Sequence, residues 1–486
     1  MGIVLNQSFK NTIITFAAFG IGGINALFLY TNFLTDEYYG LVTYLLSTAN
    51  LLMPLTAFGV QYSIVKFFSS YTTKLQRDKF LSSSLIFPLF IALPFGFFGT
   101  VFYEQISNYL SLENPIIKDF TWVIYLVAIA TAYFEIFYAW AKVQMQSVFG
   151  NILKEMFSRI AVMILLVLVF LKVIDQVEFI YYLTGAYFFR AFVMLLYALK
   201  LYTPRFTFQL PDNYIEVFKY ASYIILAGSA GAILLDIDKF MIPQKEAIAY
   251  TAYYSVGVYI ASLLEAPGRA MAQIIQPITA KALNENNAPE IHKLYKSTSI
   301  NLLLICGLFF LLINLNINQG YLLIDKEYSQ GIWVVLMISL AKLYTMSLGN
   351  NGAIISNSKY YKILLPYSIA MALAVIILNN WLISIYRMNG AALSTLIVIL
   401  FFNTVKIWYV KKKFQILPFT KKTIHLLLIL GAVYSLFFFW ELSFHPMINI
   451  ALKATLITIL YVFLVYKLKI SSDINTIINK VIKSNQ

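Results

Sequence analysis

The chain has 486 residues, of which 60% are hydrophobic and only 12% are charged, and its formal net charge is +14. Soluble domains carry about 25% charged residues, so this composition excludes an ordinary soluble protein and indicates a polytopic membrane protein. The basic residues stand at the ends of apolar runs rather than in one patch, which excludes a nucleic-acid-binding surface as the source of the positive charge.

The apolar runs predict fourteen membrane-spanning helices, because about 20 apolar residues cross the hydrocarbon core. The connections between the runs are short and leave no room for a soluble domain. The start of the chain has neither the basic segment nor the small-residue cleavage site of a signal peptide, so the first run is expected to act as an uncleaved signal. The expected spans are 11–33, 40–66, 81–103, 119–141, 152–171, 178–200, 215–242, 248–272, 297–317, 331–356, 361–382, 388–410, 422–441 and 446–466.

Loops rich in lysine and arginine alternate along the chain with loops that contain few of them, which is the pattern of the positive-inside rule. The loops of the other side are rich in carboxylates, such as Asp36, Glu104 and Glu113. With an even number of spans, this alternation predicts that both termini are cytoplasmic. The densest basic cluster is assigned to the connection after the twelfth span and comprises Lys406, Lys411, Lys412, Lys413, Lys421 and Lys422.

The spans predict two halves with the same orientation, since each half contains six of them. Pro54 and Pro267 support this repeat, because they fall at nearly the same place in each half. The last two spans are left over as an appendix, and the end of the chain has the apolar spacing of a short interfacial helix. The expected division is an N-terminal lobe (1–202), a C-terminal lobe (203–413), the last two spans (414–470) and a cytoplasmic interfacial tail (471–486).

Residue patterns typical of enzymes are absent from the sequence. His292, His425 and His445 stand far apart without metal-ligand spacing, and neither a phosphate-binding glycine loop nor a nucleophile elbow occurs. The single cysteine, Cys306, lies in an apolar run and provides no redox pair. We therefore expect a protein that is not an enzyme and that needs no cofactor or metal.

Charged residues inside the spans are the candidate functional residues, because each costs roughly 2.5–3.5 kcal/mol at the centre of a helix. Arg190 and Lys342 lie nearest mid-membrane, one in each predicted lobe. Two cations facing one aqueous cleft would attract a phosphate or another anionic head group. The full set is Glu135, Arg190, Glu265, Arg269, Lys342 and Lys453.

Structural roles are the alternatives for these charges. Glu265 and Arg269 are four residues apart on one helical face and could neutralise each other. Arg190 could pair with Glu135 on a neighbouring helix, and Lys453 can extend to the membrane surface. Three further charges, Asp236, Asp238 and Lys239, end the seventh span and are expected to form a cap and a lock between the lobes.

Several short motifs carry a resemblance to a transporter family. They are Phe218-Lys219, Asp238-Lys239-Phe240, Tyr254-Ser255-Val256, Pro267, Gln276-Pro277, Glu327-Tyr328 and Asn389-Gly390-Ala391-Ala392-Leu393-Ser394. With these motifs the chain resembles the multidrug/oligosaccharidyl-lipid/polysaccharide exporter superfamily, and within it the O-antigen (Wzx-type) polysaccharide flippases. The first span, 11–33, carries no arginine or aspartate, which departs from the lipid II flippases.

The resemblance implies two six-helix lobes in a V that expose a central cavity to the two sides of the bacterial inner membrane in turn. The implied cargo is an undecaprenyl-pyrophosphate-linked oligosaccharide, flipped from the cytoplasmic to the periplasmic leaflet for surface polysaccharide and O-antigen synthesis. Arg190, Arg269 and Lys342 would then neutralise the diphosphate. The implied protein is a monomer, with membrane lipids, a polysaccharide polymerase and export machinery as candidate partners.

A second reading of the same superfamily is a cation-coupled exporter of cationic small molecules. That branch favours acidic sites within the lobes, and Glu135 and Glu265 are the residues that could supply them. The same two carboxylates are the candidates for proton or sodium coupling in either reading.

Overall fold

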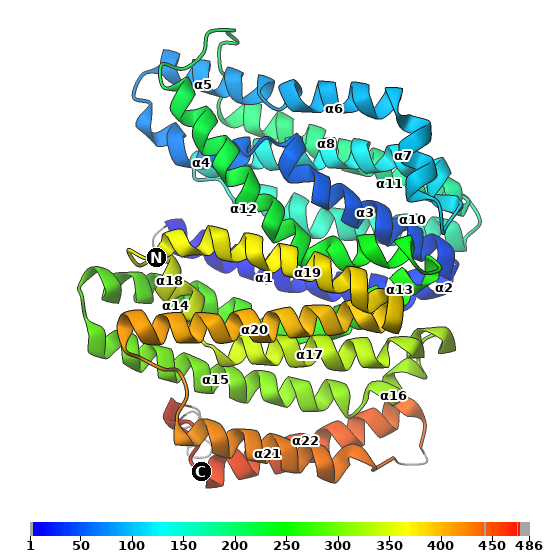
Figure 1. Cartoon of the computed structure of the whole chain (residues 1–486), viewed down its shortest axis with the longest axis vertical. Coiled ribbons are helices and arrows are strands. Elements are labelled where there is room, and N and C mark those ends of the chain that lie inside the picture. Colours follow the sequence, from blue (N-terminus) through cyan, green and yellow to red (C-terminus); the bar gives the residue numbers. More distant parts are fainter. Residues whose placement is uncertain (1–2, 442–443, 474, 477–486) are drawn as a thin grey trace. The chain divides into compact units, whose positions relative to one another are not determined.

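The computed structural model describes residues 3–441, 444–473 and 475–476, and within them every regular element is a helix (Figure 1). This confirms the predicted all-α membrane fold. By length and composition 11 described helices can cross a membrane, or up to 12 if the bent pair Asp36–Thr56 and Val60–Ser70 is one span. The predicted interfacial tail, 471–486, lies mostly outside the described residues.

Two of the expected spans, 152–171 and 248–272, do not reach the length and apolarity of the others. The first begins with a π-helix, η3 (Ile152–Phe157), and the second is interrupted by a 3-10 helix, η5 (Leu263–Glu265). Both interruptions carry charged side chains, which lowers the hydropathy of the segment. The count of fourteen spans and the cytoplasmic termini therefore stay predictions.

The chain divides into two compact units, and the boundary passes through α13 (Ala249–Ser262). Unit 1 comprises Met1–Ser255 and Ser368–Met388, and unit 2 comprises Val256–Tyr367 and Asn389–Gln486. The two units are defined by which helices lie close together. The division into an N-terminal and a C-terminal lobe is therefore still a prediction. Apart from α13, the helices of unit 1 are α1 (Ile3–Ile24), η1 (Asn25–Leu29), α2 (Tyr30–Phe33), α3 (Asp36–Thr56), α4 (Val60–Phe67), η2 (Phe68–Ser70), α5 (Lys74–Ile86), α6 (Leu89–Val101), α7 (Tyr103–Leu110), α8 (Ile116–Val143), α9 (Val148–Asn151), η3, α10 (Ser158–Phe170), α11 (Gln176–Leu201), α12 (Tyr214–Met241), η4 (Ile242–Gln244) and most of α19 (Leu364–Tyr386).

Unit 1 is built around α8, which packs against α3, α4 and α11. In its most apolar stretch, α8 has 61% of its residues buried inside the protein, against 17% for α12, so α8 is a core helix whereas most of α12 is exposed on the surface of the protein. At the start of α11, Asp175 accepts a hydrogen bond from the Glu178 amide at 2.7 Å, and the Glu178 carboxylate accepts one from the Asp175 amide at 2.9 Å. This capping box fixes where α11 begins.

The second span bends by 49° between α3 and α4. Gly59 lies at the bend with φ +63°, and a Cβ there would lie 2.8 Å from the carbonyl oxygen of Ala221 on α12. Glycine is required for both reasons, since it adopts the left-handed conformation at little cost and allows the two backbones to approach. The bend therefore positions α12 along α3 and α4.

Replacing Gly59 with alanine is expected to destabilise the protein by about 2 kcal/mol, because the left-handed conformation is strained for alanine and its Cβ meets the α12 backbone. Thermal unfolding in detergent measures the change. Gly185→Ala in α11 is the control, since no atom lies within 4 Å of a Cβ at that site. Equal unfolding temperatures for the two variants would contradict the assignment of the bend to Gly59.

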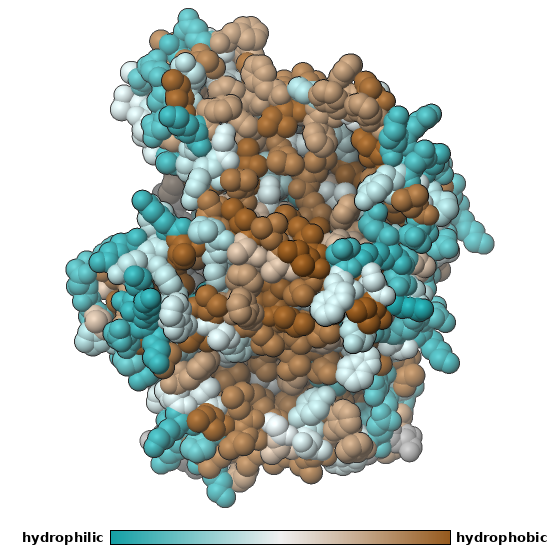
Figure 2. Space-filling view, in the orientation of Figure 1, coloured by the Kyte–Doolittle hydropathy of each residue, from teal (hydrophilic) through white to brown (hydrophobic). Residues whose placement is uncertain are grey.

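Unit 2 is built around α15 (Ala288–Asn314), of whose most apolar window 56% is buried. The last helix pair packs on it, since the Tyr461 hydroxyl donates to the carbonyl oxygen of Leu304 at 2.8 Å. The last two expected spans therefore belong to unit 2. In both units apolar side chains cover the middle of the helices, and hydrophilic ones gather at the helix ends (Figure 2). Besides η5, α15 and part of α13, unit 2 contains α14 (Ala266–Asn284), α16 (Ile317–Tyr321), η6 (Lys326–Gly331), α17 (Ile332–Ser347), α18 (Asn351–Ser356), η7 (Tyr361–Ile363), α20 (Met388–Phe414), α21 (Lys421–Phe438) and α22 (Pro446–Lys467).

Candidate functional site

Arg190 is the buried cation of unit 1, with only 6% of its surface exposed. Its guanidinium lies over the rings of Phe134 (4.3 Å) and Tyr187 (4.7 Å). Within the described part of the chain it forms no ion pair, and its Nε has no hydrogen-bond partner. Stacking on two aromatic faces lowers the cost of burying the charge, and Glu135 and Glu155 attract it only from beyond ion-pair distance.

The structure also tests the proposed pairing of Arg190 with Glu135, which is wrong. Glu135 on α8 instead binds the Lys154 ammonium from η3 at 2.5 Å. Beside Arg190 lies a recess of about 10 Å³ between α10 and α11. A cavity of that volume holds about one water molecule, so this recess by itself cannot hold a phosphate.

In unit 2, three of the predicted residues meet. The Glu265 carboxylate at the end of η5 binds the Lys342 ammonium from α17 at 2.5 Å and the Arg269 guanidinium from α14 at 3.0 Å. The expected neutralisation of Arg269 by Glu265 is confirmed, and Lys342 joins the same carboxylate. Two cations on one carboxylate leave a net positive charge. A chamber shared by Arg190 and Lys342 stays a prediction.

A second polar cluster lies where α12 ends in unit 1. Asp236 pairs with Lys239 at 2.9 Å and accepts a hydrogen bond from Asn50 on α3 at 3.4 Å. Asp238 is buried, and its carboxylate accepts hydrogen bonds from the Asn379 amide at 2.7 Å and from the Tyr254 hydroxyl. The cluster thus joins α3, α12, α13 and α19. Its role as a lock between lobes stays a prediction.

The buried Asn114 side chain, in the loop before α8, holds the loop between η4 and α13 next to that cluster. Its amide donates to the carbonyl oxygens of Pro243 (2.7 Å) and Glu246 (2.8 Å), and its oxygen accepts from the Ile248 amide (2.8 Å). In the same loop, burial raises the pKa of the Glu246 carboxyl, against the opposing effect of Arg387. The distribution of charged residues could not identify Asn114, because its amide side chain is uncharged.

Asn114→Ala is expected to lower the free energy of unfolding by about 2–3 kcal/mol, because three hydrogen bonds are lost and two backbone carbonyls lose a donor. Asn108→Ala is the control, since Asn108 is exposed on α7. Thermal unfolding of both variants in detergent makes the comparison. Equal unfolding temperatures for both would show that the loop is held by other contacts.

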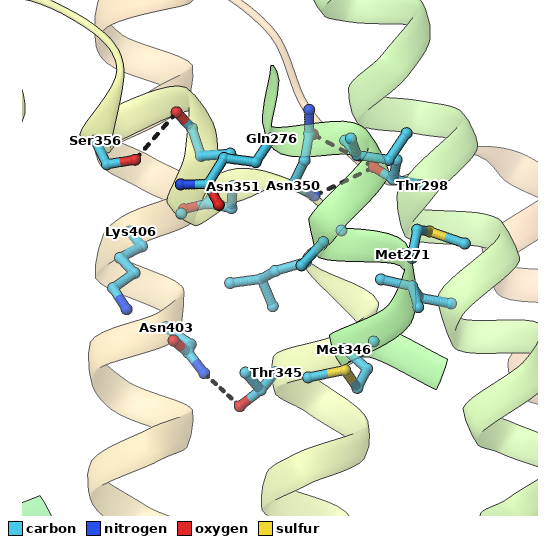
Figure 3. A pocket seen from close by; sticks show the side chains of 18 residues that line it. Met271, Gln276, Thr298, Thr345, Met346, Asn350, Asn351, Ser356, Asn403 and Lys406 are labelled. Atoms are coloured by element: carbon cyan, nitrogen blue, oxygen red, sulfur yellow. Dashed lines mark hydrogen bonds between the residues drawn. The ribbon is translucent and has the colours of Figure 1, made fainter. Parts of the chain in front are cut away.

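A cavity of about 350 Å³ lies in unit 2 between α14, α15, α17, α18 and α20. We call it the amide pocket, because Gln276, Asn350, Asn351 and Asn403 line it (Figure 3). Lys406 also lines it, from within α20, although the charge pattern grouped this residue with the loop lysines. The remaining lining residues are Gly268, Met271, Ala272, Ile275, Thr298, Leu302, Thr345, Met346, Leu348, Gly349, Gly352, Ala353 and Ser356.

A larger, mostly apolar cavity of about 690 Å³ lies between α15, α17, α20 and α21 in the same unit. Leu340, Leu343, Leu400 and Leu427 are among its lining residues, and Lys421 is its one charged lining residue. Within the described part of the chain, no group of three or more metal-ligating side chains is found.

Solved structures of transporters share this fold. The lipid II flippase MurJ in an inward closed conformation is similar over 95% of this chain and 99% of its own length, with a TM-score of 0.71 and 16% identity. A multidrug resistance MATE family transporter in an inward-facing conformation is similar over 83% and 94%, with a TM-score of 0.57 and 12% identity. At such identities the likeness shows the fold alone.

Comparison with curated protein sequences finds no significant match. A family model described as "Polysaccharide biosynthesis protein" matches residues 8–272, which is more than half of the chain. The match covers the helices that carry Arg190, Asp238 and Glu265. The chain therefore belongs to the polysaccharide biosynthesis protein family of the multidrug/oligosaccharidyl-lipid/polysaccharide exporter superfamily.

Proposed function

We propose that this protein is a flippase that moves an undecaprenyl-pyrophosphate-linked oligosaccharide from the cytoplasmic to the periplasmic leaflet of the bacterial inner membrane. The observation that carries the proposal is Arg190, a buried arginine that forms no ion pair among the described residues, within a span of a polysaccharide-family transporter. A buried cation without a carboxylate costs stability, and functional sites are where such costs are commonly retained. A diphosphate is the anion that this cargo would bring to it.

The triad in unit 2 supports the same assignment. Glu265 holds both Lys342 and Arg269, so the triad keeps a net positive charge and can add electrostatic attraction for the diphosphate. The recess of about 10 Å³ between α10 and α11 is too small for the head group, so the proposal requires Arg190 to be reached through a movement of the helices. Alternating access supplies such a movement, with the isoprenoid tail remaining in lipid while the head group crosses.

Transport of cationic small molecules is the competing function, and the ion pairs argue against it. Both candidate acidic residues are already neutralised, Glu135 by Lys154 and Glu265 by Lys342 and Arg269. A carboxylate that holds a lysine ammonium at 2.5 Å is not free to bind a cationic drug. Ion coupling through Glu135 or Glu265, monomeric action and a polymerase partner stay predictions.

Complementation tests the proposed function. In a strain that lacks its O-antigen flippase, expression of this chain is expected to restore surface display of a glycan that the chain accepts. A panel of strains with different glycans is needed, because the oligosaccharide is unspecified. Parallel expression in a pump-deficient host tests the competing function. Raised resistance to cationic dyes, with no glycan restored in any strain, would overturn the flippase assignment.

A further inference from the structure

The amide pocket is uncharged except for one lysine. Its lining residues supply amides and hydroxyls, and none of them is a carboxylate. Lys406 forms no ion pair within the described residues, and its ammonium lies over the Tyr367 ring at 4.8 Å. The pocket therefore combines a mostly apolar surface with several amides and hydroxyls and one positive charge, a mixture that suits the apolar faces and the hydroxyls of a sugar ring.

A break in a membrane helix builds the wall of this pocket. Between α17 and α18 the chain leaves the helix at Leu348, Gly349 and Asn350, where Gly349 has φ +57° and a Cβ would lie 2.5 Å from the Thr298 hydroxyl oxygen. This turn directly follows Ser347, the last residue of the membrane-spanning helix α17, and places Asn350 and Asn351 against the cavity.

Hydrogen bonds from asparagine side chains hold the turn between α17 and α18, and one buried amide oxygen has no hydrogen-bond partner. The Asn350 amide donates to the Thr279 hydroxyl at 2.8 Å, and its oxygen lies 3.3 Å from the Thr298 hydroxyl (Figure 3). The Asn351 amide donates to the Tyr295 hydroxyl at 2.5 Å, whereas the Asn351 Oδ1, although buried, has no partner. A site whose backbone is ordered by its own hydrogen bonds is preorganised for a ligand, and the exposed Gln276 side chain adds a polar group at its surface.

The chemistry of the lining selects among ligands. Apolar cargo would bury the Lys406 ammonium without a hydrogen-bond acceptor, and a cation would meet Lys406 without any carboxylate to hold it. Small-molecule pockets measure about 300–1,000 Å³, so a cavity of about 350 Å³ fits one or two sugar rings rather than a whole oligosaccharide. Ring hydroxyls match amide side chains, and a charged group next to the ring matches Lys406.

We propose that the amide pocket binds one sugar ring that carries an adjacent negative charge, with Lys406 facing the charge and Gln276, Asn351 and Asn403 binding the hydroxyls. The proposal rests on the proposed function, since it assigns this ring to the head group of a lipid-linked oligosaccharide. It adds a recognition site for the sugar to the cationic residues assigned to the diphosphate.

Cysteine protection in the full chain tests this. Cys306 is the single cysteine and is buried, and Ser356 is exposed at the pocket, so Ser356→Cys in a Cys306→Ser background offers one reactive thiol. The probes are N-acetylglucosamine 1-phosphate, N-acetylglucosamine and inorganic phosphate. We expect the sugar phosphate to slow maleimide labelling at lower concentration than either of the other two. Protection by inorganic phosphate at the same concentration as the sugar phosphate would overturn the sugar site.

Lys406→Gln is expected to weaken protection by the sugar phosphate about tenfold, the loss expected for one charge-assisted hydrogen bond. It should leave the effect of the neutral sugar unchanged. Lys359→Gln is the matched control, because Lys359 is exposed and does not line the pocket. Equal weakening by both variants would show a general charge effect and overturn the role of Lys406. Equilibrium dialysis of labelled sugar phosphate with the wild-type chain and Lys406→Gln gives the same comparison without cysteine variants.

The two proposals fail separately. If the wild-type chain restores glycan display while sugar phosphate binds no better than phosphate, the sugar site is wrong and the flippase function stands. If sugar phosphate binds in the amide pocket but no glycan is restored in any strain, the flippase function is wrong and the pocket remains a sugar phosphate site of another transporter.

Discussion

Glu265→Gln is expected to lower the free energy of unfolding by about 2–3 kcal/mol, more than any single lysine or arginine substitution in unit 2. The Glu265 carboxylate is the shared partner of Lys342 and Arg269, at 2.5 Å and 3.0 Å. Its removal leaves Lys342 unpaired within a span, where its side chain is only 16% exposed. Breaking a buried ion pair by removing one partner strands the other charge, which is the costly step.

A double variant separates this effect from loss of packing. Glu265→Gln combined with Lys342→Met is expected to recover most of the lost stability, since the stranded charge is gone. Glu285→Gln on the exposed pair with Lys281, 3.8 Å apart, is the control and should change stability by about 0–1 kcal/mol. Thermal unfolding in one detergent measures all four proteins. A double variant less stable than Glu265→Gln would show that the triad stabilises unit 2 as a network.

Arg190→Met is expected to abolish glycan display while making the protein slightly more stable. An arginine at the centre of a span costs roughly 2.5–3.5 kcal/mol, and two cation–π contacts return about 2 kcal/mol. A neutral side chain of similar length at this position should therefore stabilise the fold by about 1 kcal/mol. Loss of transport together with unchanged or increased stability would identify Arg190 as a residue retained for its charge.

The measurements are surface glycan in the complemented strain, protein level in the membrane, and thermal unfolding of the purified variant. Arg205→Met is the control, because Arg205 lies exposed in the loop before α12 and should change none of the three. If Arg190→Met unfolds more readily and still restores the glycan, Arg190 is a structural residue that ties α11 to α8. The assignment of the diphosphate to this region would then be wrong.

Charged residues were accessible to sequence reasoning because the membrane makes each one conspicuous. Arg190, Glu265, Arg269 and Lys342 were identified in this way, yet their partners were only partly foreseen. The spacing of four between Glu265 and Arg269 predicts their contact, whereas nothing in the sequence indicates that Lys342, 77 residues away, binds the same carboxylate. Likewise, the sequence places several basic residues in the spans around Glu135 and does not indicate which of them pairs with it. In the structure its partner is Lys154, in the π-helix η3, and not Arg190.

Neutral polar residues of the site could not be predicted from the sequence, because Asn, Gln and Thr also occur in membrane spans that contain no binding site. The run Gly349-Asn350-Asn351-Gly352 within an expected span was the available signal, since glycine and asparagine favour a break in a helix. The sequence does not indicate that Lys406 and Asn403 on α20 line the same cavity as this run, which the structure shows.

The sequence by itself determined the membrane environment, the all-helical fold and the positions of most spans, because hydropathy and helix length are local properties that the bilayer imposes on each segment. It also identified the charges that any account of function must explain. Only the folded structure shows which charges pair with one another, where a turn between two helices lines a cavity, and that Arg190 forms no ion pair within the described part of the chain. Those outcomes depend on distances of a few ångströms between segments far apart in the chain, and ion pairs and hydrogen bonds change sharply over such distances.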